Sequence, residues 1–404
     1  RPATMAAAMN PNIVLAILIL ASSVAMMSTD LYAPSLAHLP AYFGTSPAIA
    51  KLSMSLNALA YALGTLVHGP LSERFGRRPV FLAGLAGFTL FSLLCGLAQS
   101  IEQLIAARIL QGLMAAVEGV VVLAVIHDIF TDREQVRAIA WYGVATAMMP
   151  AVAPILGGYI FIWFGWRMNF YFLSAVALGT TVLIYRYLQE SGRRDPDALR
   201  VREVLDDYLG LLRNRDFLRY TIIGGSTIAF FFAFVTAGPF ILIKQYGLPT
   251  EYFGYFQGLL VLSYGAGSLL TGRLARRWSG DDLMLLGMVP AVGGGIALVT
   301  IVYGGHESVA ALAIVLCVMS FGDGPVFATT PTLAMNASQG RTGPAAAMLL
   351  AIEVGMGSMA ALMVGVLHDG TTRPFALTCG FFCLLAVIAW LAGTPVGRIR
   401  RAAP

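Results

Sequence analysis

The sequence predicts an all-α membrane protein with twelve transmembrane helices in two pseudo-symmetric six-helix bundles. Three observations predict it: the chain is very apolar, its apolar residues form long segments, and its basic residues gather in alternate loops. Of its 404 residues, 58% are hydrophobic and only 12% are charged, whereas a soluble domain carries about 25% charged residues. A soluble fold is therefore excluded, and helices are required because backbone polar groups find no water in lipid.

Twelve apolar segments are long enough to cross about 30 Å of hydrocarbon as helices. They are residues 13–38, 49–71, 80–98, 102–127, 138–160, 167–188, 217–243, 252–274, 283–303, 309–335, 343–367 and 375–393. The first segment could pass for a signal peptide. It runs on to Leu39 without a small-residue cleavage site, so we interpret it as a retained first helix.

The placement of Lys and Arg tests this topology. With an even number of spans both termini lie on one side, and that side would hold 21 of the 26 basic residues. The other side would hold four, and Arg108 lies inside a span. Because cytoplasmic loops are rich in Lys and Arg, we expect a multi-pass protein of the bacterial inner membrane with both termini in the cytoplasm. The same placement explains the net charge of +5 without a nucleic-acid partner.

A polar stretch in the middle divides the chain. We expect an N-terminal six-helix bundle at 1–188, a cytoplasmic linker with an amphipathic surface helix at 189–216, and a C-terminal six-helix bundle at 217–404. The segments GPLSERF at 69–75 and GRLARRW at 272–278 place Gly, Leu, Arg and an aromatic residue in the same register. Six spans plus six with a repeated motif are typical of a duplicated transporter fold.

Short motifs in this chain resemble the major facilitator superfamily. Residues 69–78 (GPLSERFGRR) match its signature between spans 2 and 3, with Glu73 where Asp is usual. Residues 108–112 (RILQG) resemble its motif B, and residues 150–158 (PAVAPILGG) resemble its antiporter motif, with an Ala where Gly is usual. Residues 29–34 (TDLYAP) are similar to the Bcr/CflA-like group of drug–proton antiporters.

The first and third of these motifs imply the moving parts. Gly76 permits a tight turn, and Asp128 at the cytoplasmic end of span 4 could pair with Arg77 or Arg78 as a latch; simple anchoring by positive charge is the alternative. The Pro and Gly residues of span 5 give a kinked helix with a thin face, which lets the two halves pack closely and rock. The gating residues expected are Gly69, Glu73, Gly76, Arg77, Arg78, Asp128, Pro150, Pro154, Gly157 and Gly158.

Five ionisable residues lie inside the predicted spans, where each charge costs at least ~2.5–3.5 kcal/mol and is functional by default. They are Asp30, Arg108, Glu118, Asp323 and Glu353, our candidates for proton coupling. Asp30 and Arg108 fall at similar depths, roughly 10 Å below the outer surface at 1.5 Å rise per residue. They can meet if spans 1 and 4 face the same cavity. We expect Asp30 to be the main proton-binding carboxylate; a permanent bridge to Arg108 that only fixes packing is the alternative.

The remaining acids have less defined roles. Gly and Pro residues flank Asp323 in FGDGP at 321–325, and this pattern predicts an interrupted helix that lines a cavity. Glu353 is similarly deep on span 11, and Glu118 shares one helix face with Arg108 and Gln111. These acids could bind cationic substrates or carry a second proton.

The expected cavity combines acids, aromatic rings and methionine, which suits lipophilic or cationic molecules. Three adjacent Phe residues begin at Phe230 on span 7, so at most one or two of their rings can face a cavity. The candidate substrate-binding residues are Asp30, Tyr32, Asn57, Tyr61, Gln111, Met148, Phe231, Phe234, Asp323 and Glu353.

The sequence argues against an enzyme. It has no Walker-type phosphate loop and no nucleophile elbow. It has no cluster of metal ligands, and its four cysteines lie in apolar segments as small packing residues. We expect no metal and no cofactor, with the proton as coupling ion.

The resemblance implies a proton-coupled efflux antiporter for multiple drugs or other small molecules, working by alternating access as a monomer. Its partners would be an amphiphilic substrate and the lipid bilayer. A dedicated exporter of a metabolite or siderophore remains an alternative, as does a proton-coupled nutrient symporter. Sodium coupling also remains open.

Overall fold

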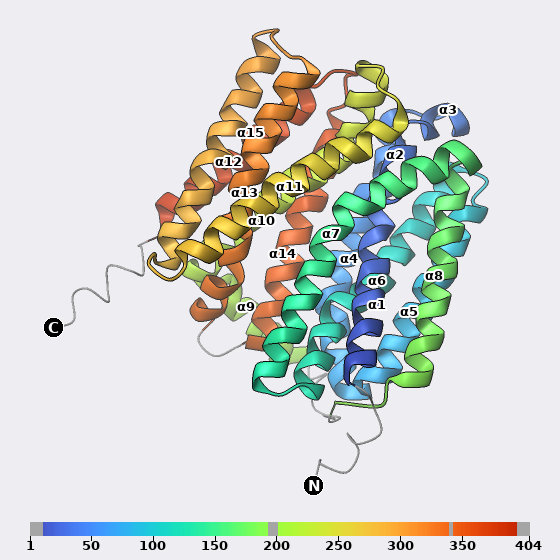
Figure 1. Ribbon diagram of the computed structural model, residues 1–404, viewed down its shortest axis with the longest axis vertical. Coiled ribbons are helices and arrows are strands. Elements are labelled where there is room, and N and C mark those ends of the chain that lie inside the picture. The colour runs from blue at the N-terminus through green and yellow to red at the C-terminus, as the bar shows by residue number, and fades with distance from the viewer. Residues whose placement is uncertain (1–10, 193–200, 339–341, 394–404) are drawn as a thin grey trace, which may run out of the picture. The chain divides into compact units, whose positions relative to one another are not determined.

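The computed structural model describes residues 11–192, 201–338 and 342–393 (Figure 1). Within these ranges the chain forms helices and no strand, and twelve of the helices have at least 20 residues. Ten of the twelve are long and apolar enough to cross a membrane. The predicted all-α membrane fold is therefore confirmed.

The first of two compact units spans Arg1–Val201. Its helices, blue to green in Figure 1, are α1 (Pro11–Asp30), α2 (Ala33–Leu36), α3 (Leu39–Phe43), α4 (Pro47–Phe75), α5 (Arg77–Leu97), α6 (Ile101–Ile129), α7 (Asp132–Phe164) and α8 (Trp166–Tyr187). In this unit α6 packs against α4 and α5, and α1 packs against α7 and α8.

The second unit spans Arg202–Pro404. Its helices are α9 (Val201–Leu212), α10 (Arg215–Pro239), the π-helix η2 (Phe240–Gln245), α11 (Thr250–Leu274), α12 (Gly280–Tyr303), α13 (Val309–Ala337), α14 (Thr342–Val366) and α15 (Arg373–Ala392). Here α13 packs against α11 and α12, and α10 packs against α14 and α15. The pairing matches that of the first unit helix for helix, which is the internal repeat expected of a duplicated fold.

Helices α4 and α11 are the two long helices that are not apolar enough to count among the ten candidate spans. The buried face of α4 includes Ser53, Asn57 and Thr65, and that of α11 includes Gln257 and Thr271. These side chains lower the hydropathy of each helix while lying inside its own unit. Because polar side chains are costly in contact with lipid, the polar residues of membrane helices face the bundle interior.

The first span is broken where the sequence predicts a continuous segment. Helix α1 ends at Asp30, and α2 begins at Ala33. Pro34 explains the break, because it has no backbone N–H and its ring would clash with the carbonyl group of Asp30, four residues earlier. Asp30 therefore lies at a helix end, 3% exposed.

Helix α9 lies in the stretch where the sequence predicts an amphipathic linker helix. Leu211 is buried in a cluster of the second unit that includes Phe217 and Tyr220. Leu205 and Leu209 remain about half exposed. Leu199, part of the predicted pattern, lies outside the described residues.

Candidate functional site

The guanidinium group of Arg108 is fully buried in the N-terminal unit and organises three helices. It donates hydrogen bonds to the carbonyl oxygens of Ser28 on α1 at 3.0 Å and Ser53 on α4 at 3.3 Å, and to Oε1 of Gln111. Gln111 in turn donates to Oγ of Ser92 on α5 at 2.7 Å. A guanidinium group offers five donors in a rigid fork, so one Arg can hold several carbonyl groups at once.

Asp30 is buried two residues after Ser28, at the end of the same helix. Tyr32 follows Asp30 and is 1% exposed. Its hydroxyl forms a hydrogen bond of 2.9 Å with Oγ of Ser53, and its ring lies 5.2 Å from the Arg108 guanidinium carbon. The structure thus brings two predicted site residues, Tyr32 and Arg108, together after the end of α1; the meeting of Asp30 with Arg108 stays a prediction.

Asn57 fixes the approach of α4 to α6. Its Nδ2 donates to the carbonyl oxygen of Arg108 at 2.6 Å. A Cβ atom at Gly112 would collide with the Asn57 backbone carbonyl, so only glycine allows the two helices to come this close. Asn57 is 4% exposed and serves the helix contact; its role in substrate binding stays a prediction.

A second polar cluster surrounds Glu118, 1% exposed and ten residues along α6 from Arg108. The hydroxyl of Tyr142 on α7 donates to Oε1 of Glu118 at 3.4 Å. Tyr61 on α4 and Ser22 on α1 also lie beside this carboxyl group. Four helices of the unit therefore meet at one acid, so a change in its charge acts on all of them.

The sequence singles out Glu118 and Tyr61 but misses Ser22 and Tyr142. Both come from helices distant in the sequence, and a single Ser or Tyr in an apolar segment carries no signal of its own. Lys51 is one of the four basic residues that the predicted topology places on the side opposite the termini, and it is 2% exposed in α4. It lies near the start of a span, where a long side chain can turn inward.

The motif at residues 69–78 is mostly helix rather than loop. Its first seven residues complete α4, and the turn into α5 is the single residue Gly76, with φ of 102°. A positive φ of this size is strained for any residue except glycine. Glu73 is exposed.

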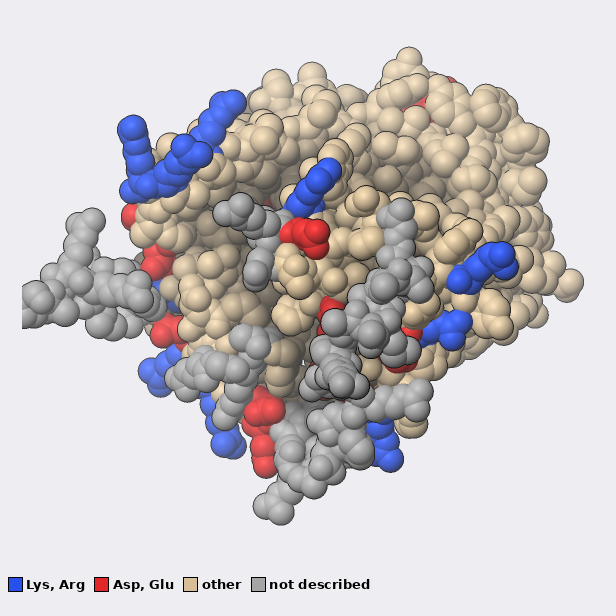
Figure 2. Space-filling model, turned by 60° about the horizontal axis from the view of Figure 1, so that its bottom comes forward, with Lys and Arg blue, Asp and Glu red and all other residues tan. Residues whose placement is uncertain are grey.

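Charged groups meet around this turn. Arg77 Nε lies 3.4 Å from Oδ2 of Asp128, and the Arg77 backbone N–H donates to Oε1 of Glu190 at 2.8 Å. Arg78 donates to the carbonyl oxygen of Tyr185 at 2.7 Å. The start of α5 and the ends of α6 and α8 are thus joined by polar contacts, and Figure 2 shows basic and acidic side chains on the face that it brings forward.

The proline-rich helix α7 runs unbroken from Asp132 to Phe164, with Pro150 and Pro154 inside it. A Cβ atom at Gly157 would collide with the carbonyl group of Leu31. The absence of a side chain at Gly157 therefore leaves room for the backbone of Leu31, at the break after α1 in the same unit. Gly158 is also buried, and the predicted role of this face between the halves stays a prediction.

The predicted interruption of the helix at Asp323 is wrong, because α13 is continuous from Val309 to Ala337. The glycines around Asp323 serve close packing instead. A Cβ atom at Gly322 would collide with the carbonyl group of Gly287 on α12, and one at Gly324 would collide with that of Tyr264 on α11. Small residues let membrane helices approach in this way.

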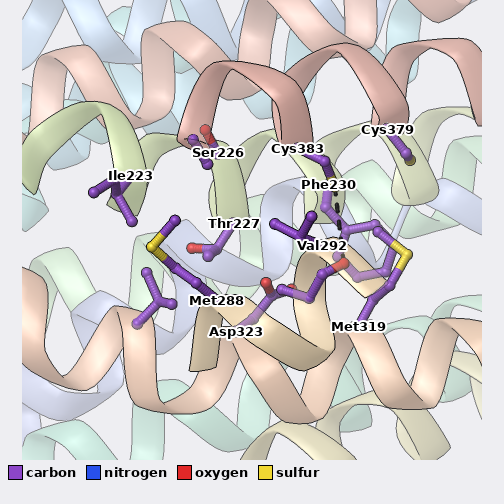
Figure 3. A pocket seen from close by; sticks show the side chains of 13 residues that line it. Ile223, Ser226, Thr227, Phe230, Met288, Val292, Met319, Asp323, Cys379 and Cys383 are labelled. Carbon is purple, nitrogen blue, oxygen red and sulfur yellow. Dashed lines mark hydrogen bonds between the residues drawn. The ribbon is translucent and has the colours of Figure 1, made fainter. Parts of the chain in front are cut away.

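Asp323 and Glu353 are both buried in the C-terminal unit, 8% and 5% exposed. Asp323 lines a small cavity between α10, α12, α13 and α15 (Figure 3). Glu353 lies against Gly224 on α10, and its Oε1 has no hydrogen-bond partner among the residues that the structure describes. Tyr264 is close enough to interact with both acids.

The other predicted lining residues differ in their surroundings. Phe234 is 2% exposed and stacks on Phe253 and Phe256 of α11, so its ring belongs to the packing of its unit. Phe231 is partly exposed, and Met148 on α7 is 52% exposed. Of these three side chains, those of Phe231 and Met148 have exposed surface that another molecule can contact.

Residues 18–361 match the sequence pattern of the Major Facilitator Superfamily. The chain is 29% identical over 371 residues to the uncharacterized MFS-type transporter YdgK of Bacillus subtilis, covering 91% of this chain and 90% of that protein. It is 25% identical to a bicyclomycin resistance protein homolog of Haemophilus influenzae, covering 89% and 91%. It is 27% identical to multidrug resistance protein D of Escherichia coli, covering 95% of both.

Solved structures support the same fold. The chain superposes on the crystal structure of a D-xylose–proton symporter with a TM-score of 0.72, covering 95% of this chain and 98% of that one. Their sequences are 15% identical, so this likeness bears on the fold alone.

Proposed function

This chain belongs to the Major Facilitator Superfamily, and from that premise we propose that it is a proton-coupled efflux antiporter for drugs and similar small molecules. The membership confirms the resemblance found in the motifs. Relatives that match nearly the whole chain are named for resistance to bicyclomycin and to multiple drugs. Export of a toxic molecule from the cell would account for such resistance.

The observation that carries the proposal is the buried polar system of the N-terminal unit. Asp30, Arg108 and Glu118 lie inside helices that cross the membrane. Their charges are too costly in that position to be retained for packing alone. Desolvation favours the neutral form of a carboxyl group, which is how a buried acid can take up a proton and release it when its surroundings change.

Asp30 is the proposed main proton carrier. It ends a helix at the break before Pro34, two residues after Ser28, whose carbonyl oxygen accepts a hydrogen bond from Arg108. A cationic substrate and a proton would compete for this negatively charged position. In an alternating-access cycle the proton enters from the outside as the substrate leaves, and Arg77 and Asp128 form the latch of one conformation.

The remaining features follow from the same proposal. The protein is a multi-pass membrane protein whose family, in bacteria, typically resides in the inner membrane. The excess of basic residues on one side supports cytoplasmic termini. We further propose that it acts as a monomer, that its substrates are lipophilic or cationic, and that it catalyses no chemical conversion.

The direct test is substrate-induced proton release from the purified protein in detergent, followed with a pH-sensitive dye. A panel of cationic, neutral and anionic compounds identifies the charge class of the substrate. Asp30→Asn is the test variant, and Asp369→Asn, which changes an exposed acid between α14 and α15, is the matched control. Release by the wild type and the control but not by Asp30→Asn supports antiport at Asp30. Proton uptake together with substrate would instead indicate a symporter.

A further inference from the structure

The cavity beside Asp323 is distinct from the polar system of the N-terminal unit. It lies wholly within the C-terminal unit, and α10, α12, α13 and α15 supply its walls. Most of the lining is apolar: Phe230, Met288, Val292, Met319 and Val326 contribute to it. An acid in such surroundings has to be neutral or has to hold a cation, because an isolated buried carboxylate is very costly.

Three side chains that line this cavity carry oxygen atoms: Ser226 and Thr227 of α10, and Asp323 of α13. Figure 3 shows Thr227 of α10 and Asp323 of α13 in the middle of the view, with Met288 and Met319 on either side. Thr227 donates its hydroxyl proton to the carbonyl oxygen of Gly224 at 2.7 Å. The lone pairs of the same oxygen therefore remain available as ligands.

Within the described ranges, no fixed positive charge neutralises Asp323. Among the residues that line the cavity there is no Lys, Arg or His, and no ion pair of Asp323 occurs in the part of the chain that the structure describes. The ionisable groups that interact with it are Tyr264 of α11 and the two thiols of α15, Cys379 and Cys383. Glu353 of α14 interacts with the same tyrosine. All of these groups are neutral or negative, so the counter-charge for an ionised Asp323 has to come from a mobile cation.

The size of the cavity restricts that cation. The space open to the centre of a water-sized sphere is about 30 Å³, enough for a water molecule but far below the ~300–1,000 Å³ of pockets that bind drug-sized ligands. A carboxylate and a hydroxyl oxygen are hard ligands, which suit a small hard cation. The cavity fits a coupling ion and excludes the exported molecule.

We propose that Asp323 and Thr227 form a binding site for one small monovalent cation, either a sodium ion or a proton held on the carboxyl group. Its role as a coupling site deepens the proposed efflux function and rests on it. Glu353 of α14 does not line the cavity, but it lies against Gly224, whose carbonyl oxygen accepts the hydrogen bond of Thr227.

The test is cation binding to the purified full-length protein in the absence of any exported substrate. Binding of radiolabelled sodium is measured at mildly alkaline pH, and infrared difference spectra between acid and alkaline pH report protonated carboxyl groups. The variants are Asp323→Asn and Thr227→Val. Thr329→Val is the matched control, since Thr329 lies on α13, is as buried as Thr227, bonds a carbonyl group of its own helix, and does not line the cavity.

Two results support the site. The first result identifies sodium as the cation. Sodium binding is saturable in the wild type and in Thr329→Val, is weakened about tenfold in Thr227→Val, and is lost in Asp323→Asn. Absence of sodium binding together with a pH-dependent carboxyl band that disappears in Asp323→Asn identifies the proton. In that case Thr227→Val shifts the pH at which the band appears.

The opposite result is equally clear. If wild-type protein binds no sodium and Asp323 gives no carboxyl band that responds to pH, Asp323 is a permanently neutral packing group and the site does not exist. Should Asp323→Asn fail to fold, Thr227→Val decides: sodium affinity and band position both equal to wild type overturn the proposal. Because binding is measured without transport, this outcome is independent of whether the efflux test succeeds.

Discussion

Tyr142 donates a hydrogen bond of 3.4 Å to Glu118, and this contact joins the proline-containing helix α7 to a fully buried acid of α6. Helix α7 otherwise packs mainly against α1 and α8. The charge state of Glu118 therefore bears directly on a helix that carries the antiporter motif. This relationship leads to the first prediction.

We expect Tyr142→Phe to move the pH dependence of efflux to higher pH, by about half a unit. The charged form of Glu118 loses one donor, and a net hydrogen bond is worth ~0.5–1.5 kcal/mol against 1.36 kcal/mol per pH unit; a bond of this length lies at the low end. Efflux from inverted vesicles across a pH series measures the shift. Tyr187→Phe, an exposed tyrosine at the end of α8, is the control. An unchanged profile would show that Glu118 does not titrate during transport.

Asp30→Asn should abolish efflux driven by a pH gradient while an uncharged substrate still binds to the purified protein. The amide keeps the shape of the side chain but cannot carry a proton. Efflux of a preloaded substrate from proteoliposomes with an imposed pH gradient gives the transport rate, and fluorescence titration gives the affinity. Gradient-driven transport at the wild-type rate in this variant would remove Asp30 from the coupling mechanism.

Arg77→Ala should slow transport strongly and lower stability only slightly. A partly exposed ion pair such as that of Arg77 with Asp128 contributes ~0.2–1 kcal/mol, so a large kinetic effect would come from the loss of one conformation. The transport rate and the thermal unfolding midpoint are measured together. Arg276→Ala, in the corresponding turn of the C-terminal half, is the control for loss of a surface charge. Equal effects of the two variants would contradict a latch.

Gly112→Ala should destabilise the N-terminal unit by about 1–3 kcal/mol, the usual cost of overpacking. Its Cβ atom would meet the backbone carbonyl of Asn57, which cannot move aside as a side chain can. Gly143→Ala on α7 is the opposite case, because nothing lies within 4 Å of the new atom and Ala favours a helix over Gly by about 0.8–1 kcal/mol. Thermal unfolding in detergent compares the two. Similar midpoints would show that α4 and α6 separate easily at this point.

Sequence patterns predicted the spans and the repeat because both are local. Length and hydropathy are properties of a segment, and lipid allows it no conformation other than a helix. Arg108 and Gln111 could be placed on one face of α6 for a similar reason, since the helical period fixes which residues lie together. Intramembrane charges such as Glu118 and Asp323 are visible in the sequence because they are rare there.

The tertiary structure alone decided what those groups contact. Ser22, Tyr61 and Tyr142 come from three helices, and only packing brings them to Glu118. The glycines around Asp323 predicted a broken helix, yet they allow α11 and α12 to approach α13. A glycine can serve a turn or a close contact equally well, and its neighbours decide which. The role of Thr227 in the proposed site could also not be predicted from the sequence. Four helices supply the walls of the cavity, and no single helix has a residue pattern that indicates it.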